Sequence, residues 1–164
     1  MYRNLFHNCS GVAAIEFALV VPVLLMIVGG LSDFPAALLD EIQIATGVAD
    51  GAAYAFSKAQ NLSGTLAPVD FGDVQSKVSS SINLPNVTVT VTPPTLGCVS
   101  HNTTSTPPVT TLTPVNPGST CGANNNPPGT YMVITASYVY SPIMPLYSRL
   151  RSTTLTKSVV VRLY

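Results

Sequence analysis

The sequence predicts an α+β fold in which a long N-terminal helix, first membrane-spanning and then amphipathic, packs on a small antiparallel β-sheet. Three observations support this prediction. An almost uncharged apolar run covers residues 12–31, apolar residues at helical spacing continue to about residue 60, and the C-terminal half contains three segments rich in β-branched and aromatic residues. Since the chain has 164 residues, little more than one modest domain remains beside a membrane helix.

The apolar run from Val12 to Leu31 contains a single ionisable residue, Glu16. About 20 helical residues at ~1.5 Å each cross the ~30 Å hydrocarbon core of a bilayer. The run is longer than the ~7–15 apolar residues of a secretory signal peptide, and it leads directly into more helical sequence. We therefore expect a retained transmembrane helix over residues 12–31, preceded by a short leader over residues 1–11.

The charges that flank the run indicate its orientation. Arg3 is the sole basic residue before the run, whereas Asp33, Asp40 and Glu41 follow it. The positive-inside bias then places the leader in the cytoplasm and the rest of the chain outside it. We expect a single-pass membrane protein whose C-terminal domain lies outside the cytoplasm.

Beyond the membrane, the helix is predicted to continue over residues 32–60. Pro22 predicts a mild kink, and Pro35 predicts a break where the helix leaves the bilayer. One apolar seam on this continuation alternates steps of four and three residues. The seam consists of Leu38, Ile42, Ala45, Ala49, Ala52 and Phe56. It can pack on the chain's own domain or on other subunits, and the sequence leaves both interpretations open.

The domain over residues 61–164 is predicted to hold one short helix and three strands. The helix covers residues 69–82, with Asp70 as its N-cap. The strands cover residues 87–92, 130–141 and 153–164. Residues 93–128 are dominated by Pro, Thr, Asn, Ser and Gly and are predicted to form a long loop or a disordered insertion.

Two of the three cysteines, Cys98 and Cys121, lie in this Pro/Thr-rich stretch, while Cys9 lies on the other side of the membrane run. We predict a disulfide between Cys98 and Cys121, which requires an oxidising compartment. There is no CxxC spacing, and neither His7 nor His101 has a cysteine cluster nearby in the sequence. We therefore expect no metal site.

The composition argues against nucleic-acid binding and against catalysis. Only 9% of the residues are charged and the formal net charge is zero, whereas phosphate neutralisation needs clustered Lys and Arg. A catalytic nucleophile needs a positioned base, and the two histidines lie in the leader and in the predicted loop. We expect a protein that is not an enzyme, uses no cofactor and does not bind nucleic acid.

The residues from Gly11 to Phe17 (GVAAIEF), followed by an apolar stretch, resemble a type IV prepilin processing site. More narrowly, GVAAIEFALVVPVLLMIVGGLSDF resembles the TadE-like family, the minor pilins or pseudopilins of Tad (tight adherence, type IVc pilus) systems. The C-terminal segments TASYVYSPIMP and LTKSVVVRLY are similar to that family's last strands. The resemblance implies a pilin-like fold and cleavage after Gly11 by a prepilin peptidase, which leaves Val12 as the new N-terminus. It also implies other pilin subunits and the Tad inner-membrane machinery as partners. The expected location is then the bacterial inner membrane, with the C-terminal domain in the periplasm.

The same resemblance implies that Glu16 and Phe17 serve in assembly. A carboxylate toward the bilayer interior costs ~2.5–3.5 kcal/mol even on insertion scales, so Glu16 needs a partner. The α-amino group that cleavage creates on Val12 of a neighbouring subunit is such a partner. Alternatively, Glu16 lies near the headgroups and reaches water. The predicted function is a non-catalytic pilus assembly subunit; the alternative is an uncleaved single-pass scaffold or surface-binding envelope protein.

Overall fold

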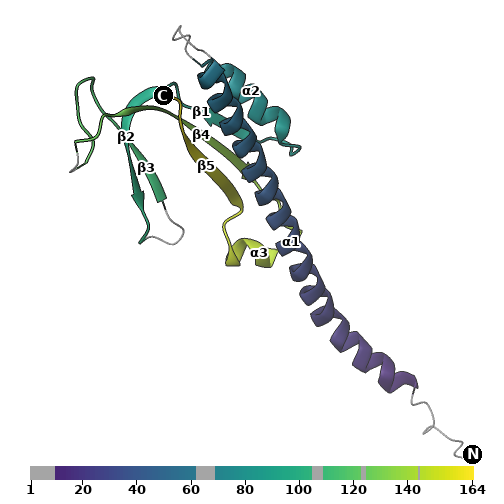
Figure 1. Cartoon of the computed structure of the whole chain (residues 1–164). Helices are drawn as coiled ribbons and strands as arrows, with labels where there is room; N and C mark the ends of the chain where they lie inside the picture. The colour runs from purple at the N-terminus through teal and green to yellow at the C-terminus, as the bar shows by residue number, and fades with distance from the viewer. Residues whose placement is uncertain (1–9, 62–68, 105–108, 123–124, 144) are drawn as a thin grey trace, which may run out of the picture. The chain divides into compact units, whose positions relative to one another are not determined.

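The computed structural model describes residues 10–61, 69–104, 109–122, 125–143 and 145–164 (Figure 1). It has the predicted α+β fold, with a long apolar N-terminal helix and a small antiparallel sheet. The chain forms two compact units: the N-terminal unit combines Met1–Leu39 with Ser141–Thr153, and the sheet unit combines Asp40–Tyr140 with Thr154–Tyr164. The helices are α1 (Ser10–Asn61), α2 (Phe71–Ser81) and α3 (Pro145–Leu150), and the strands are β1 (Thr88–Val91), β2 (Thr95–Asn102), β3 (Val109–Pro114), β4 (Gly129–Val139) and β5 (Thr154–Arg162).

Helix α1 runs from Ser10 to Asn61 and contains both Pro22 and Pro35. The break predicted at Pro35 is therefore wrong. A proline inside a helix removes one backbone hydrogen bond and crowds the preceding turn. A break, however, leaves four unpaired backbone groups at each new helix end. Close to an apolar run, where little water is available to pair those groups, the continued helix costs less.

Strand β4 is the centre of the sheet. It pairs with β5 along one edge, from Tyr131↔Arg162 to Val139↔Thr154. Along its other edge it pairs first with β2, at residues 129–131, and then with β1, at residues 134–137. Strands β1, β4 and β5 lie close to the three segments whose composition predicted strands.

Strands β2 and β3 lie inside residues 93–128, so the prediction of a long loop there is wrong. The two strands form a hairpin with a register from Gly97↔Pro114 to Asn102↔Val109. The low-complexity composition concealed a strand pattern, because Thr and Val are both β-branched residues that favour extended backbone. Most side chains of the hairpin stay exposed. This exposure explains why the segment lacks the apolar residues of a core strand.

Helix α2 begins as the sequence predicts. Asp70 is its N-cap, and the Asp70 carboxylate accepts a hydrogen bond from the backbone N–H of Gly72 at 2.8 Å. Val74 and Val78 on its inner face are fully buried. They join a core in the sheet unit to which α1 and β4 also contribute; its largest fully buried side chains from those two elements are Ile44, Met132 and Ile134.

Two glycines let α1 approach this core closely. A Cβ atom added at Gly47 would overlap the side chain of Ile82, and one added at Gly51 would overlap Val78. Ala55, one further turn along the helix, is completely buried. The buried face of α1 in the sheet unit thus combines Ile44 and Val48 with small residues. The two glycines receive the branched side chains of Val78 in α2 and of Ile82 just after it.

The predicted apolar seam does not form this buried face. Its larger members in the sheet unit, Ile42 and Phe56, remain 52% and 46% exposed, and Ala45 and Ala49 are also exposed. Packing of the seam on the chain's own domain is therefore wrong for these residues. The reason is that α1 has a second apolar face about 120° around the helix, and the two glycines on that face permit the closer approach.

Candidate functional site

The predicted processing site lies at the start of α1. Helix α1 begins at Ser10, so the bond between Gly11 and Val12 lies in its first turn. A Cβ atom at Gly11 would meet nothing within 4 Å, and the Val12 side chain is exposed. The first four N–H groups of a helix have no partner within it, so unwinding this turn costs little. Most of the predicted leader, residues 1–9, lies outside the described residues.

The predicted assembly residues follow about one turn later. Phe17 is 71% exposed, and Glu16 is exposed as well. Val12 and Glu16 are four residues apart, so they lie on one face of α1. The structure therefore presents a carboxylate in a belt of exposed apolar side chains, and it places this carboxylate on the same face as the residue that processing would make the N-terminus.

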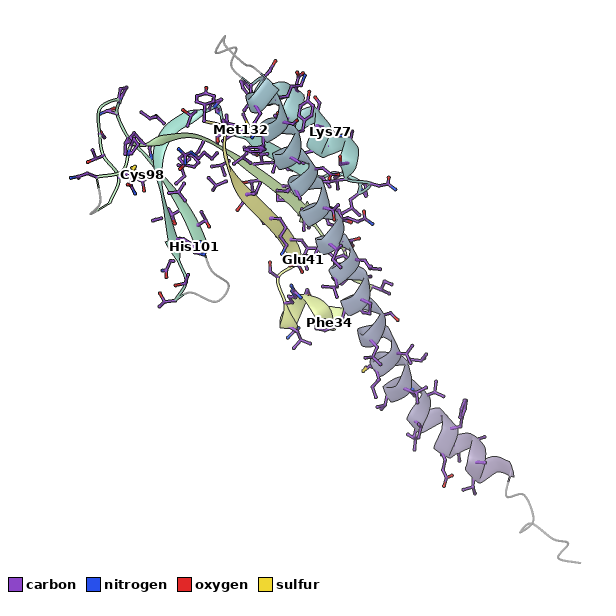
Figure 2. All side chains as sticks on the ribbon, in the orientation of Figure 1. Phe34, Glu41, Lys77, Cys98, His101 and Met132 are labelled. Carbon is purple, nitrogen blue, oxygen red and sulfur yellow. A yellow bond between two sulfur atoms is a disulfide. The ribbon has the colours of Figure 1, made fainter. Side chains whose placement is uncertain are left out.

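The remainder of the apolar run is equally exposed. Within the described residues, α1 is the one helix long and apolar enough to cross a membrane, and none of its most apolar stretch is buried. Figure 2 shows these side chains standing out around the first part of the α1 ribbon. Such exposed apolar area is typical of an anchor that lipid or partner helices cover.

A buried acid lies just past the end of this run. Asp33 has no exposed surface, and its carboxylate accepts a hydrogen bond from the backbone N–H of Ile143 at 2.9 Å. Both residues belong to the N-terminal unit, as does helix α3, which starts at Pro145. Sequence reasoning used Asp33 only as a topology signal and missed this contact. The available signal was the position of this acid directly after the apolar run.

Charged groups of the sheet unit have structural roles. The Lys157 ammonium lies 2.6 Å from the Glu41 carboxylate and connects β5 with α1. Burial raises the pKa of the Asp40 carboxyl above its ordinary value. The folded chain therefore binds a proton on Asp40 more tightly than the unfolded chain does. Protonated Asp40 thus contributes to stability at low pH, and this contribution is lost as the pH rises through the folded-state pKa.

The structure joins Cys98 and Cys121 in a disulfide, with 5.4 Å between their Cα atoms. Cys98 lies in β2, and Cys121 lies in the turn that follows β3 and forms an isolated bridge with Asn126. Figure 2 shows Cys98 near the base of the β2–β3 hairpin. The pairing that the cysteine positions predict is thus present in the structure.

Residues 11–53 match the protein family described as TadE-like protein. No curated protein and no solved structure matches the chain significantly. The family match begins at Gly11, contains the whole apolar run, and ends within the part of α1 that packs in the sheet unit. It confirms the resemblance that the residues around Glu16 indicated. Over these residues, the chain is similar to TadE-like proteins.

Proposed function

We propose that this chain is a TadE-like minor pilin or pseudopilin, a non-catalytic subunit in the assembly of a Tad-type pilus or secretion system. The observation that carries the proposal is the family match from Gly11 through the apolar run. Two features of the structure support it. The apolar part of α1 is exposed on all sides, and the apolar seam that includes Ile42 and Phe56 remains uncovered in the sheet unit.

In this proposal, a prepilin peptidase cuts after Gly11 while the leader is in the cytoplasm. Val12 then carries a free α-amino group that is largely protonated near neutral pH. A neighbouring subunit presents this cation to Glu16, so that neither charge is left alone in the hydrocarbon. Phe17 and the exposed side chains around it supply the apolar contact between the two helices. The pairing sets the stagger of one subunit on the next.

Cleavage is tested by replacing Gly11 with leucine. The missing side chain at Gly11 lets a peptidase close over the scissile bond, so Gly11→Leu is expected to leave an unprocessed chain that still enters the membrane. Mass spectrometry of the N-terminus gives the result directly. Gly30→Leu is the matched control, because a Cβ atom at Gly30 of the same helix also meets nothing within 4 Å. Wild-type chain that begins at Met1 when the peptidase is present would favour the uncleaved scaffold.

Assembly is tested by replacing Glu16 with alanine. The cleavage bond is intact in Glu16→Ala, so processing should persist while cross-linking to other pilin subunits falls. Membrane insertion should become easier, by less than the ~2.5–3.5 kcal/mol that a charge costs at the centre of a membrane helix, since Glu16 lies near the start of the run. Glu16→Gln keeps the size but not the charge and should show the same defect, whereas Ile15→Ala on the neighbouring position should assemble normally. Normal assembly of both Glu16 variants would contradict the charge pairing.

The proposed topology makes a separate prediction. A reporter that is active only outside the cytoplasm should be active when fused after Tyr164, and a cytoplasmic reporter at the same position should be silent. The reason is that residues 12–31 cross the bilayer once, with the single leader cation Arg3 on the inner side. The opposite pattern of activity would rule out both the pilin and the scaffold.

A further inference from the structure

In the N-terminal unit, the segment between β4 and β5 contacts α1 at a defined position along the helix axis. The hydrogen bond from the Ile143 N–H to the buried Asp33 carboxylate defines that position. Because Asp33 is fully buried, losing a hydrogen-bond partner there is costly. Helix α3, which belongs to the same unit, starts at Pro145, just after this contact (Figure 1). The segment around Ile143 is therefore attached to α1.

The position of this contact on α1 coincides with the edge of the membrane. The apolar run ends at Leu31, and Asp33 lies two residues further, or roughly 3 Å along the helix axis. A bilayer of ~40–45 Å total thickness around a ~30 Å hydrocarbon core has an interfacial layer of several ångströms on each side. If residues 12–31 fill the core, Asp33 and Ile143 lie within this layer.

The side chains around the attachment suit an interface. Ile143 is 80% exposed and Leu150, the last residue of α3, is 66% exposed. The Arg149 side chain, next to Leu150, is also exposed. Apolar side chains beside an arginine are the composition of surfaces that insert a few ångströms into a bilayer while the cation remains among the phosphates. We call Ile143, Arg149 and Leu150 the juxtamembrane patch.

We infer that the juxtamembrane patch rests on the bilayer surface, with Ile143 and Leu150 inserted between the headgroups and Arg149 on the phosphates of anionic phospholipid. This inference rests on the membrane insertion of α1 that the proposed function requires. It adds a second membrane contact, next to β5 in the chain, so that the domain outside the membrane is held to the lipid at two places. A processed subunit would release both contacts when it leaves the bilayer.

Tryptophan fluorescence tests this contact, because the chain contains no tryptophan of its own. The purified full chain is reconstituted in vesicles whose lipids carry bromine near the ester end of the acyl chains. Ile143→Trp and Leu150→Trp are expected to lose emission to the brominated lipid and to shift toward the blue. Val99→Trp, on an exposed apolar position of β2, should keep its emission. Leu24→Trp, in the apolar run, reports whether α1 has inserted at all.

The outcomes are distinct. Loss of emission in Leu24→Trp without loss in Ile143→Trp would overturn the patch and leave the proposed function standing, whereas no loss in Leu24→Trp would count against membrane insertion itself. Equal loss in Val99→Trp would show that the whole domain lies on lipid and would also overturn the patch. Charge reversal in Arg149→Glu should reduce the loss in Leu150→Trp when phosphatidylglycerol is present. No reduction there would overturn the role of anionic headgroups.

Discussion

Replacing Gly51 with leucine is expected to destabilise the sheet unit by about 3 kcal/mol or more, because the new side chain overlaps a packed core. Even a single Cβ atom at Gly51 would overlap the side chain of Val78 and lie 3.7 Å from the Ile134 Cδ1 atom. Val78 and Ile134 are both fully buried. The branched Val78 side chain has few rotamers, so it cannot move aside without displacing its neighbours. Leucine gains ~1 kcal/mol of helix propensity over glycine, which is smaller than this penalty.

Chemical denaturation of the detergent-solubilised chain, followed by circular dichroism, measures the effect. Ala53→Leu is the matched control, since Ala53 lies on an exposed face of the same helix and should tolerate leucine. A double variant sharpens the test. Gly51→Ala combined with Val78→Ala should be more stable than the sum of the single changes predicts, by ~0.5–3 kcal/mol, because the smaller partner makes room for the new methyl group. A Gly51→Leu chain as stable as Ala53→Leu would show that α2 does not pack here.

Much of this fold could be predicted because local pattern and tertiary packing agree. Asp70 caps α2 where a polar residue precedes an apolar stripe, and the alternating and β-branched segments became β1, β4 and β5. The β2–β3 hairpin could not be predicted in this way. Its strands are stabilised mainly by pairing with each other and bury little, so they carry no alternation of apolar and polar residues.

The buried face of α1 shows a different limit of sequence reasoning. Both faces of the helix repeat every three to four residues, and the seam containing Ile42 and Phe56 is the more apolar one. The structure buries the face with Gly47 and Gly51 instead, because closeness of approach decides packing and glycine contributes nothing to a hydropathy pattern. Ile42 and Phe56 of the seam are left outward, where another helix can cover them.

Some residues of the candidate site could be predicted from the sequence, and others could not. Gly11 and Glu16 could be singled out because their spacing before an apolar run is a motif, and the family match covers the same residues. The contact between Asp33 and Ile143 joins residues 110 positions apart. No local pattern records such a contact, since it depends on how the chain returns to α1 after β4. The sequence shows an acid past the membrane run, but its burial emerges only in three dimensions.

Loss of the disulfide is the other change expected to have a large effect. Cys98 and Cys121 are 23 residues apart, and closing a loop of this size stabilises a fold by about 3 kcal/mol in the chain-entropy model. The position of Cys98 adds a local consequence. The pairing of β2 with β4 ends at Gly97, so beyond Cys98 the strand pairs with β3 alone. Without the disulfide, the hairpin and the turn around Cys121 should open more readily than the rest of the sheet unit.

Serine substitutions separate these consequences. Cys98→Ser and Cys121→Ser should each lower the unfolding free energy by about 3 kcal/mol, and the double variant should lose no more than either single one, because each change already breaks the same bond. Limited proteolysis should cut between β2 and β4 first, while β4–β5 stays protected. Cys9→Ser, which leaves both bonded cysteines in place, is the control and should behave like wild type. Two free thiols at Cys98 and Cys121 in non-reducing peptide maps of envelope-derived protein would contradict the bond, and fully additive losses would show that the cysteines act separately.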